Sequence, residues 1–132
     1  MLKISNLPGI EIKSICFDSG NGTVLNFQNL TGIQFINESV TRHNIIKNCY
    51  FNLLNKGIEF FDSGENPNSN NNMDSNSIQN CIFYYCEIGI CIDQLNVYNC
   101  DIYYCSFYGN YNYTKHHLLI KKGHADVIGG LS

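Results

Sequence analysis

Hydrophobic residues in this chain fall in short runs that alternate with polar residues, and the runs are bounded by asparagine, glycine or serine. Ile58 and Phe60 form one such alternation, and Ile90 and Ile92 form another. Runs of this kind, rich in β-branched and aromatic residues, are typical of β-strands. No stretch places apolar residues at the three- and four-residue spacing of an amphipathic helix. The pattern therefore predicts an all-β protein built from short strands.

A four-residue signature, Gly-Ile-x-Ile or Gly-Ile-x-Phe, recurs along the chain. Its copies are residues 9–12, 32–35, 57–60 and 89–92, so they begin 23, 25 and 32 residues apart. A recurring period in this range indicates a solenoid or another repeat architecture. Three short strands with a bend after each would use about 22 to 25 residues. Each repeat is therefore predicted to form one rung of a parallel β-solenoid.

The repeat extends beyond this signature, because residues 44–60 and 76–92 match at eight positions with a constant offset of 32, seven of them identical and the eighth an apolar pair, Phe60 and Ile92. A third copy, offset by a further 24 residues, keeps Ile102, Cys105 and Phe107. In that copy Tyr104 replaces an asparagine and Tyr113 falls where the glycine is expected. Equivalent residues of stacked rungs lie directly above one another, roughly 4.8 Å apart.

Stacking of this kind predicts columns of identical residues. The expected columns are aliphatic (Ile46, Ile78, Ile102, Ile128), aromatic (Phe51, Phe83, Phe107) and thiol (Cys49, Cys81, Cys105). Asn48 and Asn80 are expected to stack at a bend, where amide side chains can hydrogen-bond from rung to rung.

The pattern Asn-x-Ile-x-Asn-Cys-x-Phe followed by Gly-Ile-x-Ile resembles the rungs of the pectin-lyase-like superfamily. The chain most resembles a bacteriophage tailspike or tail appendage segment. This resemblance implies a right-handed parallel β-helix (β-solenoid) of about five short-stranded rungs, the last incomplete. Residues 1–132 would then be a single β-helix domain, expected to be a fragment of a larger protein. Residues 63–77 are rich in asparagine and serine and are expected to form a loop insertion.

Charge and hydropathy narrow the classes of partner. The chain has 11 acidic and 8 basic residues, for a net charge of −3. No basic stripe of the kind that nucleic-acid binding requires is present, so nucleic acid is not an expected partner. No apolar run approaches the roughly 18 residues of a membrane-spanning helix, and no signal peptide is visible, so no membrane span is expected.

Seven cysteines offer two interpretations. Three of them occupy one repeat position, which favours buried, reduced thiols in a chain that folds in a reducing compartment. Cys81, Cys86 and Cys91 recur every five residues, and this spacing keeps a zinc site open as the minor alternative. No metal site and no cofactor are predicted.

Glu59 and Asp93 are the candidate catalytic residues. They belong to adjacent predicted rungs and could act as a carboxylate pair for glycoside cleavage. The alternative is that both are exposed acids on a polar sheet face. No complete catalytic motif is present, so the sequence does not decide whether the chain is an enzyme.

Tyrosines and one further acid are the candidate binding residues. Six of the nine tyrosines lie between Tyr98 and Tyr113. On an outer face, their flat rings and hydroxyl groups would suit a sugar or a partner protein; inside the coil they would be core. The predicted binding residues are Asp62, Tyr108, Tyr111 and Tyr113.

Three functions are compatible with these features. The first is a virion tailspike or tail-fibre segment that contacts a host surface glycan, made in the host cytoplasm and assembled as a homotrimer or with other appendage subunits. The second is a fragment of a polysaccharide lyase or glycoside hydrolase. The third is a non-catalytic structural or adhesin solenoid, which would be extracellular or on a cell surface.

Overall fold

A computed structural model describes residues 1–5, 8–20, 30–36, 42–61, 73–94, 97 and 99–129. These residues form fourteen β-strands and no helix. Hydrogen bonding groups the strands into three sheets, and every strand pair is parallel. The prediction of an all-β, parallel architecture is confirmed.

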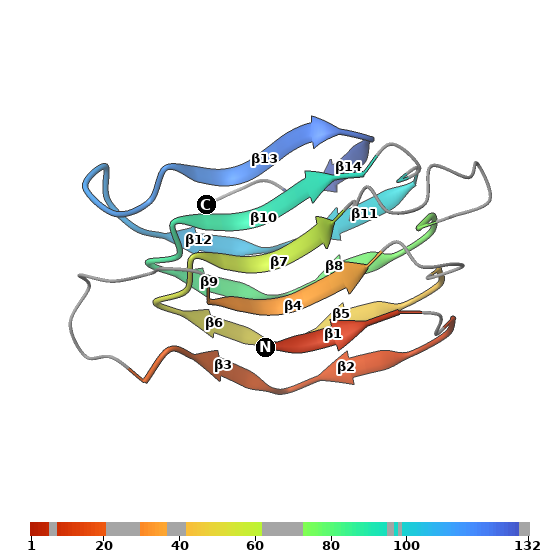
Figure 1. The fold of residues 1–132 in the computed structure, drawn as a ribbon, viewed down its shortest axis with the longest axis horizontal. Helices are drawn as coiled ribbons and strands as arrows, with labels where there is room; N and C mark the ends of the chain where they lie inside the picture. The colour runs from red at the N-terminus through yellow and green to blue at the C-terminus, as the bar shows by residue number, and fades with distance from the viewer. Residues whose placement is uncertain are drawn as a thin grey trace.

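Each sheet collects every third strand of the chain (Figure 1). Sheet A contains β1 (Leu2–Ile4), β4 (Thr31–Ile36), β7 (Lys56–Phe61), β10 (Ile88–Asp93) and β13 (His116–Lys122). Sheet B contains β2 (Glu11–Lys13), β5 (Ile45–Lys47), β8 (Ser77–Gln79), β11 (Cys100–Tyr103) and β14 (Ala125–Ile128). Sheet C contains β3 (Cys16–Asp18), β6 (Tyr50–Asn52), β9 (Ile82–Tyr84) and β12 (Ser106–Tyr108). The chain thus visits the three sheets in turn, and we call each consecutive set of strands a rung.

The predicted aromatic column is confirmed and gains a fourth member. The Phe51, Phe83 and Phe107 rings stack with centroids 4.8 Å apart, and Phe17 lies 5.1 Å below Phe51. A second stack, Phe35 on Phe60 at 4.7 Å, runs along sheet A. Through these stacked rings the hydrophobic core continues from one rung to the next.

The aliphatic column is confirmed except at its last position. In sheet B, Ile12, Ile46, Ile78 and Ile102 lie in one register. The residue opposite Ile102 in β14 is Val127, and Ile128 lies opposite Tyr103. The prediction for Ile128 was wrong because the last repeat is offset by 25 residues, so equivalent positions lie one residue earlier in the chain.

The first copy of the glycine signature is not equivalent to the other three. Gly32, Gly57 and Gly89 lie in sheet A, whereas residues 9–12 lead into sheet B, where Ile12 pairs with Ile46. The first strand of sheet A is β1, and its Leu2 pairs with Ile33. Gly9 lies at a bend with a positive φ of 75°, so its glycine serves a turn and not a rung contact.

Asparagine ladders form at a different position from the one predicted. Asn44 and Asn76 are both 1% exposed, and the Asn76 Oδ1 accepts hydrogen bonds from the Asn44 backbone N–H (3.0 Å) and Nδ2 (3.1 Å). Asn44 Oδ1 accepts from the Ile10 N–H at 2.8 Å in the rung below. Asn48 and Asn80 instead adopt positive φ values of 53° and 49° at the bend between sheets B and C, a conformation that asparagine tolerates.

Candidate functional site

Tyrosines form a row along the outer face of sheet C. Because successive residues of a strand point to opposite faces, the tyrosines that flank the buried phenylalanine column point outward. The Tyr84 ring lies 6.3 Å from the Tyr50 ring and 6.2 Å from the Tyr108 ring, measured between centroids. We call Tyr50, Tyr84 and Tyr108 the tyrosine row. Tyr84 and Tyr108 are 40% and 51% exposed and Tyr50 is half-buried, so tyrosine rings of three successive rungs lie on one face.

The aromatic surface continues around the corner between sheets C and A. Tyr85 packs edge-on against Tyr84 at 4.7 Å, and Tyr113 lies 6.1 Å from Tyr85. Tyr111 is 92% exposed in the same turn. Two of the predicted binding tyrosines, Tyr108 and Tyr111, are therefore exposed, and Tyr113 is half-buried beside them.

Asp18 is the single charged residue on the four described strands of sheet C. It is aligned with Asn52, Tyr84 and Tyr108 in successive strands. Asn52 Nδ2 donates to Asp18 Oδ2 at 3.0 Å, and the Gly20 N–H donates to Oδ1 at 2.8 Å. These two hydrogen bonds, Asn52 first, lower the pKa of Asp18, so the carboxylate stays ionised at neutral pH.

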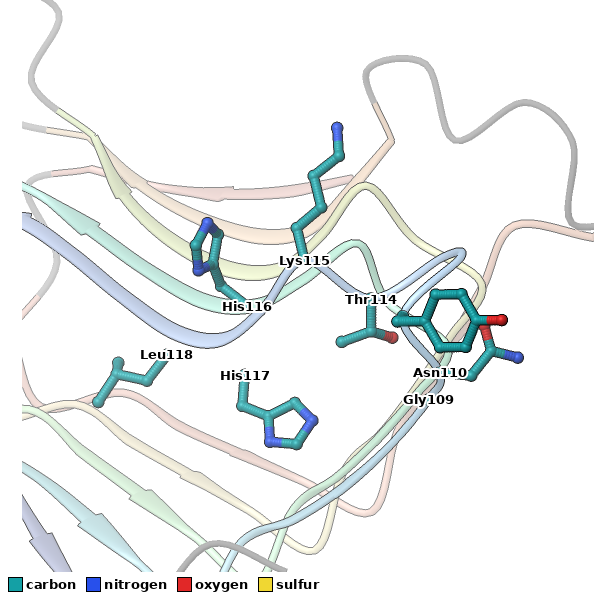
Figure 2. Close-up of a pocket in the computed structure, with 8 residues that line it drawn as sticks. Gly109, Asn110, Thr114, Lys115, His116, His117 and Leu118 are labelled. Carbon is teal, nitrogen blue, oxygen red and sulfur yellow. The ribbon is translucent and has the colours of Figure 1, made fainter.

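A cavity of about 580 Å³ adjoins the tyrosine row and is lined by residues between Gly109 and Leu118 (Figure 2). The backbone N–H groups of Tyr113 and Thr114 both bond to the Asn110 carbonyl and close the turn that forms one wall. His117 lies opposite Gly89 in the sheet register. Its ring stacks on Phe107 with centroids 5.2 Å apart, so an imidazole takes the place of the next ring above the phenylalanine column.

Side chains at the start of β13, and that of Lys115 just before it, are divided between two sides of the chain. Figure 2 shows His117 and Leu118 on one side, and Lys115 and His116 projecting from the other. Lys115 forms an ion pair with Glu87, and Asn55 Nδ2 donates to the same carboxylate at 2.6 Å. Lys115, and then Asn55, lower the pKa of Glu87. The lysine at this corner therefore already has an anionic partner.

The predicted catalytic pair lies on sheet A, where each carboxylate has a lysine partner. Glu59 is 3% exposed; it pairs with Lys56 and accepts from Gln34 Nε2 at 2.7 Å. Asp93 is bonded by Lys121 Nζ at 3.1 Å. The residue opposite Glu59 in β10 is Cys91, and Asp93 lies opposite Phe61. The two carboxylates are therefore two residues out of register on adjacent strands, and each contacts a lysine instead of the other acid.

The remaining predicted residues fall partly outside the described structure. Asp62 lies outside the described residues, as do residues 63–72 of the predicted loop insertion. Of the rest of that segment, Met73 and Asn76 are buried and Ser77 begins β8.

All seven cysteines are free thiols, and six of them are buried. The thiol column is confirmed: Cys49, Cys81 and Cys105 donate to the carbonyl oxygens of Ile12, Ile46 and Ile78 in the preceding rung. Burial raises the pKa of Cys86 to about 11 and that of Cys100 to about 12. Within the described part of the chain, no three His, Cys, Asp or Glu side chains are grouped to hold a metal ion.

This distribution predicts the reactivity of the thiols. We expect a maleimide reagent at pH 7 to modify one cysteine of the native chain, Cys16, because it alone is exposed and the reagent cannot reach the six buried thiols. In denaturant all seven should react. Mass spectrometry of the labelled protein measures both numbers, and Cys16→Ser should abolish native labelling. Rapid modification of two or more thiols in the native protein would contradict the burial of the thiol column.

Sequence reasoning identified the end of this surface but missed Tyr50, Tyr84, Tyr85 and His117. A signal for the tyrosine row was present, because a tyrosine directly precedes or follows each phenylalanine of three rungs. His117 could not be found in this way, because the turn after β12 shifts the last rung relative to the repeat.

Comparisons with protein-family models, curated proteins and solved structures give no match to this chain. Among the described residues, no helix is long and apolar enough to cross a membrane.

Proposed function

We propose that this chain is a right-handed parallel β-helix that binds a polysaccharide through the tyrosine row, without cleaving it. The carrying observation is the set of tyrosine rings on three successive rungs of sheet C. Tyr84 and Tyr108 lie opposite each other in the register, and the Tyr50 ring, whose residue precedes its phenylalanine instead of following it, lies 6.3 Å from the Tyr84 ring. Rungs repeat every 4.8 Å or so. An extended polymer lying along the solenoid axis would therefore meet an aromatic side chain on each of these three rungs.

Tyrosine suits this role for two physical reasons. Its ring offers apolar area to the C–H groups of a sugar, and its hydroxyl group can donate to or accept from a sugar hydroxyl. Cross-rung ring contacts hold the three side chains in place, so little conformational entropy would be lost on binding.

The resemblance of the rungs to tailspikes supports placing the chain in a virion appendage that contacts a host surface glycan. A homotrimer, or other appendage subunits, would be its assembly partners. An adhesin solenoid on a cell surface would use the same tyrosine row. A lyase or hydrolase is the weaker proposal, because Glu59 and Asp93 are both engaged by lysines.

Substitution of the row tests the proposal. We expect Tyr84→Ala and Tyr108→Ala each to weaken binding to a recognised polysaccharide by about tenfold, as the loss of an aromatic contact of ~1.4 kcal/mol requires. The ligand is found on an array of neutral and acidic glycans and the affinities are measured by calorimetry. Tyr103→Ala, on sheet B, is the matched control and should bind normally. Equal affinity in all three variants would reject the tyrosine row as the binding surface.

A further inference from the structure

We propose that the thiol column is an oxidative modification site, in which a hydroperoxide links Cys49 to Cys81 through a reversible disulfide between two neighbouring rungs. The inference concerns side chains that the tyrosine row does not use, so it is independent of the proposed function. Three observations carry it: the stacking of the two cysteines, the contact between their thiols, and the position of Cys49 next to the edge strand of sheet C.

Backbone hydrogen bonds place the cysteines of the column directly above one another. The Ile82 N–H donates to the Cys49 carbonyl oxygen at 2.9 Å, and the Ser106 N–H donates to the Cys81 carbonyl oxygen at 3.0 Å. In a parallel ladder the residue before such a donor lies opposite the acceptor, so Cys81 lies opposite Cys49 and Cys105 lies opposite Cys81. Neighbouring strands are about 4.8 Å apart, and disulfides join Cα atoms about 4.4–6.8 Å apart. Adjacent members of the column meet this requirement.

The thiols of the column also share one orientation. Besides its bond to the preceding rung, each sulfur lies 3.4–3.5 Å from the carbonyl oxygen two residues earlier in its own rung: Lys47, Gln79 and Tyr103. Side chains oriented alike in stacked rungs approach each other, and the Cys81 thiol lies within hydrogen-bonding distance of the Cys49 sulfur. This contact lowers the pKa of Cys49. The thiolate form, which a peroxide oxidises, is thereby favoured at Cys49.

A small oxidant can reach Cys49 from the edge of sheet C. The edge strand is β3, and the Tyr50 N–H donates to the Ile15 carbonyl oxygen at 3.0 Å, which places Ile15 directly below Cys49. Ile15 is 43% exposed, and Cys16 beside it is also exposed. Segments with few buried contacts open locally at little cost in free energy. Hydrogen peroxide, which is scarcely larger than water, can enter through openings that are too small for a maleimide.

The reaction balances with hydrogen peroxide as the oxidant. The Cys49 sulfur attacks one peroxide oxygen, which breaks the O–O bond and yields a sulfenic acid and one water. The Cys81 sulfur then attacks the sulfenic sulfur and displaces its oxygen, which leaves with the Cys81 proton as a second water. Two thiols have lost two electrons, and the peroxide has gained them. Parallel side chains keep the rung spacing of about 4.8 Å, whereas disulfides favour Cβ atoms about 3.5–4.5 Å apart, so a dithiol should reduce this bond readily.

A thiol count tests the proposal, in the Cys16→Ser background that leaves six buried thiols. The native protein is treated with hydrogen peroxide, catalase removes the excess, and the protein is denatured, labelled with maleimide and weighed by mass spectrometry. We expect six labels before peroxide, four after it, and six again after dithiothreitol. Trypsin cleaves after Lys47 and Lys56, so a non-reducing digest should contain peptide 48–56, which holds Cys49, linked to peptide 57–115, which holds Cys81.

Variants identify the pair. In Cys81→Ala all five remaining thiols should survive peroxide, because no adjacent pair is left. Cys86→Ala, at a buried cysteine outside the column, is the matched control and should still lose two of its five thiols. If Cys81→Ala does not fold, the double variant Cys49→Ala/Cys105→Ala also leaves Cys81 alone and should keep all four thiols. Six labels after peroxide, a loss that these column variants do not prevent, or a disulfide that lacks peptide 48–56 would overturn the proposal.

Discussion

Replacing Phe83 with alanine is expected to lower the free energy of unfolding by about 3–5 kcal/mol. Phe83 is 1% exposed and is stacked on both sides, 4.8 Å from Phe51 and 4.8 Å from Phe107. Its removal takes apolar area out of the core and leaves a cavity that the stacked rungs cannot close without shifting. Urea denaturation followed by circular dichroism measures the change.

Tyr84→Ala provides the control, because Tyr84 follows Phe83 in the same strand but is 40% exposed. Its cost should be about 1 kcal/mol, typical of a partly exposed site. If Phe83→Ala does not fold well enough to measure, Phe83→Leu should still cost about 1–2 kcal/mol. A cost for the Phe83 substitutions no greater than that of Tyr84→Ala would contradict the aromatic column.

The second large effect is expected from Gly57→Ala, which we predict to destabilise the chain by about 2–4 kcal/mol through overpacking. A Cβ atom at Gly57 would lie 2.6 Å from the Gly89 carbonyl oxygen and 2.6 Å from Phe83 Cδ1. The first of these neighbours is backbone of the next rung, so relief requires the two rungs to separate. Thermal and urea unfolding both report the loss.

A double substitution shows whether the clash is the cause. Phe83→Leu removes the ring contact but leaves the carbonyl, so Gly57→Ala should cost less in the Phe83→Leu background than in the unaltered chain. The difference is a coupling free energy, which contacting residues show and distant residues do not. Strict additivity of the two changes would mean that Gly57 and Phe83 are not in contact.

The sequence was sufficient to predict the interior because the repeat places identical side chains at equivalent positions. Phe51 and Phe83 are 32 residues apart, and so are Cys49 and Cys81. Only rungs that stack in register place both pairs side by side. The parallel sheets and three of the core columns follow from that one observation.

The sequence-based prediction failed at positions where the local backbone conformation, and not the repeat, determines which residue is present. Gly9 carries the signature but serves a bend, with a φ of 75°. The amide ladder uses Asn44 and Asn76, which are buried, while Asn48 and Asn80 supply left-handed turns. Sequence does not distinguish an asparagine needed for its amide from one needed for its φ, because the same residue type serves both.

The candidate site was predictable only in part for a related reason. Tyr108 and Tyr111 could be identified by composition, but the row also depends on Tyr84, which the register places beside Tyr108, and on Tyr50, whose ring lies next to that of Tyr84. The cavity is formed by the turn between Gly109 and Thr114, which lies outside the repeat. After this turn His117 lies opposite Gly89, where the repeat predicts another glycine.

Alignment of the rungs is the claim on which the core and the tyrosine row both depend. The most direct measurement is a proton NOE spectrum of a sample labelled at phenylalanine and tyrosine. Ring centroids 4.8 Å apart along the phenylalanine column, and about 6 Å apart along the tyrosine row, predict cross-peaks from Phe83 to both Phe51 and Phe107 and from Tyr84 to both Tyr50 and Tyr108. Absence of the Phe83 cross-peaks in a folded sample would contradict the stacked arrangement and the binding surface built on it.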